Sequence, residues 1–128
     1  MLAVSWRRVT PLLLAALAVA VADGLTAIVK LAVGERRPTD LHPLVAIPHS
    51  NSFPSGHTST AFAAATVLAR LEPRAGPAFF VLAAAIGHSR LYVGVHFPLD
   101  VACGAALGVA TALLLLAAAR RRSVRLRR

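Results

Sequence analysis

Residues 98–119 read PLDVACGAALGVATALLLLAAA, and Asp100 is the only charged residue among them. A helix needs roughly 20 mostly apolar residues to cross the hydrocarbon core of a bilayer, and this stretch is long enough. Polar and apolar residues do not alternate along it, which disfavours a β-strand. The stretch therefore predicts a transmembrane helix.

Three more apolar stretches precede it, at about residues 9–33, 55–71 and 77–92. The first is long enough to span a bilayer, the second is marginal, and the third suffices only if its polar end reaches the interface. Hydrophobic residues make up 57% of the chain and charged residues 15%, whereas a soluble domain carries about 25% charged residues. We therefore expect residues 1–128 to form one all-α domain, an integral-membrane bundle of about four transmembrane helices.

Basic residues gather at three places that four spans would put on one side of the membrane. Arg7 and Arg8 precede the first stretch, Arg70 and Arg74 lie at the turn between the second and the third, and arginines dominate a basic tail at residues 120–128. The positive-inside rule assigns that side, and with it both termini, to the cytoplasm. Because no aromatic residues alternate with the tail arginines for base stacking, the tail indicates a membrane partner rather than a nucleic acid. We expect a multi-pass protein of the cell membrane.

The N-terminal stretch has a second interpretation. Arg7-Arg8, the apolar run and Ala20-Val21-Ala22 also resemble a cleavable signal peptide. The apolar run continues to Val33, however, which is longer than the hydrophobic part of a signal peptide, and this length favours a retained helix.

Two clusters of polar residues lie on the expected outer side. Lys30 lies near the end of the first apolar stretch and Arg37 follows the stretch. Two cations so placed predict an anionic ligand unless they merely snorkel to the interface. Ser55 and Gly56 begin the second helix, with His57 in its first turn. The free N–H groups of a helix start bind anions, although a plain helix start beside an interfacial histidine explains the same pattern.

A third cluster joins His96 to Asp100. Their spacing of four residues puts both side chains on one face of a helix. A carboxylate there fixes the tautomer of the imidazole, as in nucleophilic triads. A helix-capping aspartate or a metal site are the alternatives, but the cations Lys30, Arg37 and Arg90 would repel a metal ion. Three cations, a helix start and two histidines together fit phosphoryl transfer without a metal or other cofactor.

These spacings resemble the type 2 phosphatidic acid phosphatase (PAP2) superfamily. Its first motif, K-x6-RP, matches Lys30 and Arg37-Pro38; its second, PSGH, matches residues 54–57; its third, SR-x5-H-x3-D, matches Ser89-Arg90, His96 and Asp100. The superfamily also includes soluble vanadium haloperoxidases, which the apolar helices here disfavour.

The resemblance implies a role for each motif residue. His96 would attack phosphorus and form a phosphohistidine, Asp100 would orient it, and His57 would protonate the leaving oxygen and then activate water. The phosphate oxygens would be held by Lys30, Arg37, Ser55, Gly56 and Arg90. The implied activity is that of a metal-independent phosphatase of lipid phosphates or diphosphates, with polyprenyl (undecaprenyl) diphosphate, phosphatidylglycerol phosphate and phosphatidic acid as candidate substrates. A non-catalytic binder of anionic lipids and a vanadate-dependent haloperoxidase are the alternatives.

The chain departs from the family in one respect. Membrane members usually have six helices with the motifs on the last four, so residues 1–128 correspond to a core without the first two helices. A minimal member, a homodimer that completes the lipid groove, and a truncated gene product are the open explanations.

The remaining polar residues carry weaker expectations. Asp23 lies seven residues before Lys30 within the first apolar stretch. An acid at membrane depth indicates either a function or a structural pairing with Lys30. The other three histidines are expected at the interface (His88) or in a loop (His42 and His49).

Overall fold

The computed structural model describes the backbone of residues 3–38 and 43–125 and the side chains of residues 12–38 and 43–122. His42 and the side chains of Arg7 and Arg8 lie outside these ranges. The elements in chain order are α1 (Ala3–Val33), α2 (Gly56–Leu71), a short 3-10 turn η1 (Pro73–Ala75), α3 (Gly76–Tyr92) and α4 (Pro98–Arg125). No residue of the described ranges is in a strand, so the prediction of an all-α fold is confirmed.

Two helix bounds differ from those expected. Helix α1 begins at Ala3 rather than near Val9, and α4 continues through the arginines to Arg125. The expected tail at residues 120–128 is therefore helical over most of its length. The reason is that arginine is a good helix former, and neither glycine nor proline follows Ala119 to end the helix. Helix α1 ends where the sequence indicates, because Gly34 has a φ of 67° and donates its N–H to the Lys30 carbonyl (3.0 Å).

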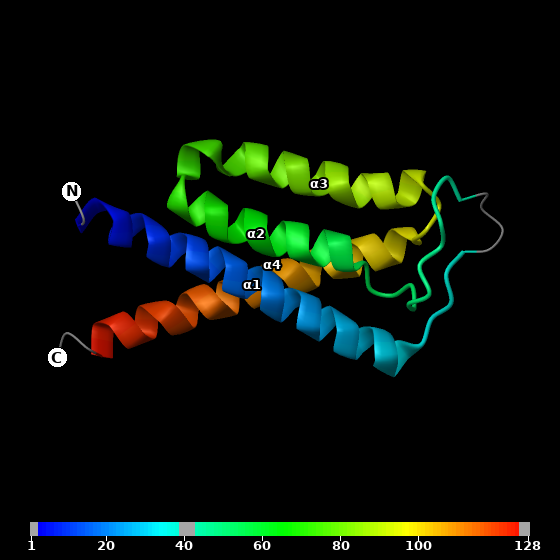
Figure 1. Cartoon of the computed structure of the whole chain (residues 1–128), viewed down its shortest axis with the longest axis horizontal. Helices are drawn as coiled ribbons and strands as arrows, with labels where there is room; N and C mark the ends of the chain where they lie inside the picture. Colours follow the sequence, from blue (N-terminus) through cyan, green and yellow to red (C-terminus); the bar gives the residue numbers. More distant parts are fainter. Residues whose placement is uncertain (1–2, 39–42, 126–128) are drawn as a thin grey trace.

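Consecutive helices run antiparallel, and α2 packs against α1, α3 and α4 (Figure 1). Small residues allow this close packing. A Cβ atom at Gly104 would lie 2.6 Å from the carbonyl oxygen of Ser55, and one at Gly108 would lie 2.1 Å from that of Ser59. The α2–α4 contact therefore requires glycine at both positions, as in membrane helix pairs. The fully buried core is equally small, with Ala18, Ala22, Ala63, Val67 and Ala112.

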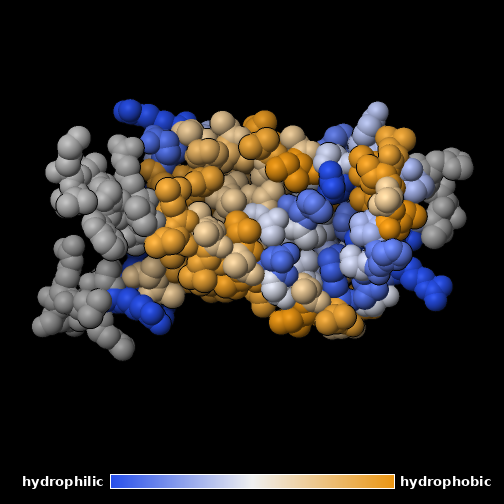
Figure 2. Space-filling model, viewed as in Figure 1, coloured by the Kyte–Doolittle hydropathy of each residue, from blue (hydrophilic) through white to orange (hydrophobic). Residues whose placement is uncertain are grey.

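Two segments within the described ranges are long and apolar enough to cross a membrane, Leu12–Val33 of α1 and Pro98–Arg122 of α4. With 16 and 17 residues, α2 and α3 fall short of that length, as their sequences indicated. Large apolar side chains point outward from both long segments, among them Leu13 (64% exposed) and Leu114 (72%). Apolar residues dominate the middle of the face in Figure 2, and hydrophilic residues gather toward the end where residues 43–55 lie.

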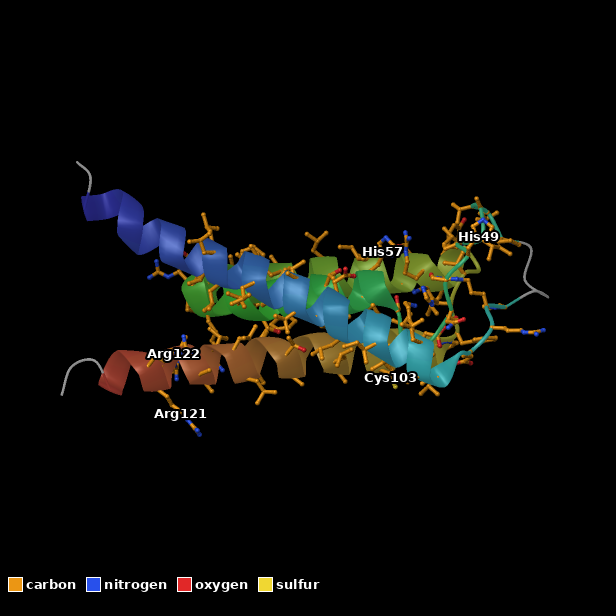
Figure 3. The ribbon with its side chains drawn as sticks, turned by 60° about the horizontal axis from the view of Figure 1, so that its bottom comes forward. His49, His57, Cys103, Arg121 and Arg122 are labelled. Carbon is orange, nitrogen blue, oxygen red and sulfur yellow. The ribbon has the colours of Figure 1, made fainter. Side chains whose placement is uncertain are left out.

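The up-and-down topology brings all three motifs to one end of the bundle. The end of α1, the start of α2, the end of α3 and the start of α4 meet there, beside residues 34–38 and 43–55 (Figure 1). Arg121 and Arg122 lie at the opposite end, far from His57 and His49 (Figure 3). The fold thus separates a motif-bearing end from an arginine-bearing end.

Candidate active site

The segment before α2 is fastened to the end of α1 by Lys30. Its Nζ donates hydrogen bonds to the carbonyl oxygens of Asn51 (2.8 Å) and Ser52 (3.0 Å). The Asn51 side chain donates back to the Lys30 carbonyl (2.7 Å), and the Ser52 N–H donates to that of Glu35 (2.8 Å). Lys30, to which the family resemblance assigns phosphate binding, therefore also holds Ser52 in position.

His96 and Asp100 form the expected pair at the start of α4. His96 Nδ1 lies 3.1 Å from Asp100 Oδ2, and both side chains are buried. The same carboxylate oxygen accepts hydrogen bonds from the Phe97 N–H (2.9 Å) and from the Ser52 hydroxyl. Asp100 therefore caps its helix and holds the imidazole at the same time, so the two interpretations of the sequence do not exclude one another.

Arg37 determines which imidazole nitrogen carries the proton. Its Nη1 lies 3.2 Å from His96 Nε2, and because a guanidinium only donates hydrogen bonds, Nε2 must accept. The imidazole proton is therefore on Nδ1, where it is donated to Asp100. This tautomer leaves a lone pair on Nε2, the nitrogen that faces Arg37.

Burial keeps the imidazole neutral. It lowers the pKa of His96 to about 4, with a contribution from the nearby positive charge of Arg37, while the hydrogen bond to Asp100 opposes the shift. At neutral pH the group is therefore an uncharged base. Burial also lowers the pKa of Arg37, but a guanidinium stays protonated at any physiological pH.

Backbone and hydroxyl groups fix the Arg37 guanidinium from three sides. It donates to the Ser50 carbonyl (2.9 Å), to the Ser50 hydroxyl (3.1 Å) and to the Val95 carbonyl (2.8 Å). One of its remaining N–H groups meets His96 Nε2. A phosphoryl group that approached Nε2 would meet this cation directly, which makes the arrangement suited to charge stabilisation.

A cavity of about 470 Å³ opens beside His96. Six of the eight predicted site residues line it: Lys30, Arg37, Gly56, His57, Arg90 and His96. Asp100 lies behind His96. Ser55 is fully buried away from the lining; its hydroxyl accepts a hydrogen bond from Thr58 (2.9 Å) and its N–H donates to the Asp100 carbonyl (2.9 Å). Within residues 12–38 and 43–122, no group of three or more His, Cys, Asp or Glu side chains is placed to hold a metal ion.

The sequence-family model of the PAP2 superfamily matches residues 11–123 of this chain. The chain belongs to the PAP2 superfamily. Its curated relatives include lipid A 1-phosphatase of Rhizobium johnstonii (38% identical over 101 residues, 72% of this chain and 41% of the relative). They also include decaprenylphosphoryl-5-phosphoribose phosphatase of Mycobacterium tuberculosis (38% over 92 residues, 69% and 50%) and the bacitracin transport permease protein BcrC of Bacillus licheniformis (49% over 63 residues, 49% and 31%). The chain thus spans between about a third and half of the length of these relatives.

Solved PAP2 structures share the fold. The transmembrane PAP2 type phosphatidylglycerolphosphate phosphatase of Bacillus subtilis superposes with a TM-score of 0.69 at 31% identity, covering 85% of this chain and 59% of that one. LpxE of Aquifex aeolicus superposes with a TM-score of 0.70 at 34% identity, covering 86% and 67%. The expected resemblance is confirmed, and the protein is a membrane protein.

The PAP2 motifs do not include every residue that builds this site. Ser50, Asn51 and Ser52 supply the hydroxyl and carbonyl groups that hold Arg37, Lys30 and Asp100. Their signal in the sequence is a run of small polar residues that a single residue, Phe53, separates from the PSGH motif. His49 and His88 are exposed and do not line the cavity.

The residues that line the cavity outside the PAP2 motifs include two polar residues of the helices, Asp23 on α1 and Thr60 on α2. Thr60 lies one turn after Gly56, so its position follows from helical periodicity once the start of α2 is known. Asp23 does not pair with Lys30, whose ammonium is bonded to the carbonyl groups of residues 51 and 52. The structural pairing that the spacing allowed is therefore not formed.

Proposed function

We propose that this PAP2 protein hydrolyses a lipid phosphate or diphosphate through a phosphohistidine on His96, without a metal ion. One observation carries the proposal. The Nε2 lone pair of a neutral imidazole lies beside the Arg37 guanidinium, while Asp100 holds the other nitrogen. A nucleophile, the group that orients it and a cation for the phosphoryl oxygens are thus assembled at one wall of a cavity.

The reaction proceeds in two displacements. His96 Nε2 attacks phosphorus, the bond from phosphorus to the lipid oxygen breaks, and His57 gives a proton to the leaving oxygen. Asp100 stabilises the imidazolium that forms. Water, deprotonated by His57, then attacks the phosphohistidine; inorganic phosphate leaves and His96 regains its lone pair.

The phosphoryl oxygens are held by the cations that line the cavity, Lys30, Arg37 and Arg90, and by the Gly56 N–H at the start of α2. The Arg90 guanidinium is braced by Ser89 (3.1 and 3.2 Å). Ser55 supports the site indirectly, because the hydrogen bond from its N–H to the Asp100 carbonyl joins the start of α2 to the start of α4.

The substrate class follows from the relatives and the fold. The names of the two curated phosphatases and of the Bacillus subtilis enzyme describe phosphatases of lipid A, a decaprenyl-linked phosphoribose and phosphatidylglycerol phosphate. Polyprenyl diphosphate, phosphatidylglycerol phosphate and phosphatidic acid are the candidate substrates here. We also propose that the bilayer is the working environment, that residues 1–128 act as one domain, alone or as a homodimer, and that nucleic acid is no partner.

The arrangement of charge supports an orientation. The end of α4 that carries Arg121 and Arg122 lies opposite the site (Figure 3), and arginines favour the cytoplasmic side. We propose that both termini are cytoplasmic and that the cavity opens on the outer face.

The test is phosphate release by the purified protein in detergent with EDTA present. We expect release from at least one of the three lipids, loss of it in His96→Ala, and full activity in His88→Ala, a matched change at an exposed histidine outside the cavity. Lipid binding without phosphate release would instead support a non-catalytic lipid-binding protein. Activity that survives His96→Ala would instead support a different nucleophile.

A further inference from the structure

Asp23 lies on the wall of the active-site cavity but has no role in the chemistry described above. It belongs to the apolar segment Leu12–Val33, where an acid is costly and usually functional. Its side chain is exposed and forms no hydrogen bond or ion pair with a described residue, and its charge acts on His57, which lines the same cavity. Seven residues separate it from Lys30, which places it about 10 Å farther along the helix axis, away from the phosphate-binding cations.

The register of α1 against α2 brings Asp23 level with Thr60. A Cβ atom at Gly56 would lie 3.6 Å from the side chain of Thr26, so these two residues face one another. Because the helices are antiparallel, moving one turn back along α1 to Asp23 corresponds to moving one turn forward along α2 to Thr60. Both line the cavity, and we call this pair the inner end of the cavity.

The inner end offers only hydrogen-bond acceptors. The Thr60 hydroxyl donates its proton to the carbonyl oxygens of Gly56 (3.0 Å) or His57 (3.2 Å), which leaves its lone pairs for a ligand. An ionised carboxylate at Asp23 accepts and cannot donate. The other end of the cavity offers cations, so the two ends have opposite requirements: phosphoryl oxygens at one and N–H or O–H groups at the other.

We propose that Asp23 and Thr60 bind a hydrogen-bond donor that the substrate carries between its phosphate and its hydrocarbon tail, as a sugar or polyol phosphate does. This inference rests on the proposed phosphatase activity and narrows its substrate class. A polyprenyl phosphate has no donor at this place. In a polyprenyl diphosphate the leaving group is a second phosphate, which the charge of Asp23 repels. His57, which protonates the leaving oxygen, lines the same cavity and lies three residues before Thr60 on α2.

The test compares two substrates that differ only in three sugar hydroxyl groups, which can donate hydrogen bonds. One is an alkyl glucopyranoside 6-phosphate, the other its 2,3,4-trideoxy analogue with the same alkyl chain, and the readout is the ratio of kcat/KM for phosphate release in detergent. We expect the wild-type protein to prefer the hydroxylated substrate about tenfold or more, the worth of a hydrogen bond to a charged group. Asp23→Ala should bring the ratio close to one, and Thr60→Val, which keeps the side-chain shape, should lower it.

Leu25→Ala is the matched control, because Leu25 is on the same helix, is exposed (38%) and does not line the cavity; it should keep the wild-type ratio. Equal use of both substrates by the wild-type protein, or a preference that Asp23→Ala leaves intact, overturns this inference while the phosphatase proposal stands. Faster release from farnesyl diphosphate than from the glucoside phosphate overturns it too. No release from either glucoside phosphate also overturns this inference; if the three lipids of the phosphatase test release no phosphate either, the phosphatase proposal fails with it.

Discussion

Replacing Asp100 with asparagine separates the two tasks of this carboxylate. Three donors converge on Oδ2, namely His96 Nδ1, the Phe97 N–H and the Ser52 hydroxyl. The backbone donor cannot move, so the amide oxygen of Asn must occupy the Oδ2 position and its NH2 group the Oδ1 position. His96 then keeps its proton on Nδ1 and its lone pair on Nε2. Asp100→Asn therefore removes the negative charge beside His96 but leaves the tautomer of His96 unchanged.

The size of the effect follows from the geometry. When His96 attacks phosphorus it becomes a cation, with Asp100 Oδ2 only 3.1 Å from Nδ1. Two unit charges about 4 Å apart attract by about 4 kcal/mol at an effective dielectric constant of 20, which corresponds to about a thousandfold in rate. Asp100→Ala should be slower still, because it removes the acceptor as well as the charge. The stability of Asp100→Asn should also fall. The Oδ1 atom is buried without a partner among the described residues, so the NH2 group that replaces it would be unsatisfied.

The assay is kcat for phosphate release, with the ¹⁵N NMR shifts of the His96 ring as a report on the tautomer. Glu35→Gln provides a matched acid-to-amide change outside the cavity lining and should behave as wild type. A ring proton on Nε2 in Asp100→Asn would refute the reasoning about the three donors. Activity equal to that of the wild-type protein would refute the role given to the charge.

Three other predictions concern the nucleophile, its cation and the helix contact beneath them. The pKa of His96 lies near 4, so the acid limb of kcat/KM that belongs to this group should fall only below about pH 5. Since the unfolded chain binds this proton near pH 6.5, thermal stability should decline as the pH drops from about 6.5 toward 4; a stability maximum below pH 5 would contradict the burial of a neutral imidazole. Arg37→Lys keeps the charge but loses the bonds to Ser50 and Val95, so kcat/KM should fall about tenfold or more, and unchanged kinetics would show that the guanidinium geometry is unimportant. Gly108→Ala places a methyl group 2.1 Å from the Ser59 carbonyl oxygen and should destabilise the protein by about 1–3 kcal/mol, whereas Gly24→Ala, with nothing within 4 Å, should not; equal melting temperatures would contradict the close α2–α4 contact.

The parts of the site that lie within one helix turn were predictable from the sequence. His96 and Asp100 are four residues apart, and the helix start at Gly56 follows directly from the Pro-Ser-Gly sequence. Helix termini marked by glycine or proline were equally clear. The end of α4 was not, because arginine residues continue a helix as readily as they form a solvated tail.

Contacts between distant segments were not predictable. The Ser52 hydroxyl reaches Asp100 across 48 positions of sequence, and nothing in the local pattern distinguishes it from other loop serines. Ser55 was expected at the phosphate, but the close approach of Gly104 to its carbonyl places it inside the α2–α4 contact. Lys30 was expected to bind an anion, to snorkel to the interface or to pair with Asp23. Its bonds to two loop carbonyls depend on the path of the whole segment before α2.

The stereochemical course at phosphorus tests the double displacement through His96 most directly. A substrate whose transferred phosphoryl group is a chiral, isotopically labelled thiophosphate gives a product of defined configuration when turned over in labelled water. Attack by His96 followed by attack by water inverts phosphorus twice, so the account predicts overall retention. Inversion would mean that water attacks the lipid phosphate directly, and it would contradict the nucleophilic role of His96.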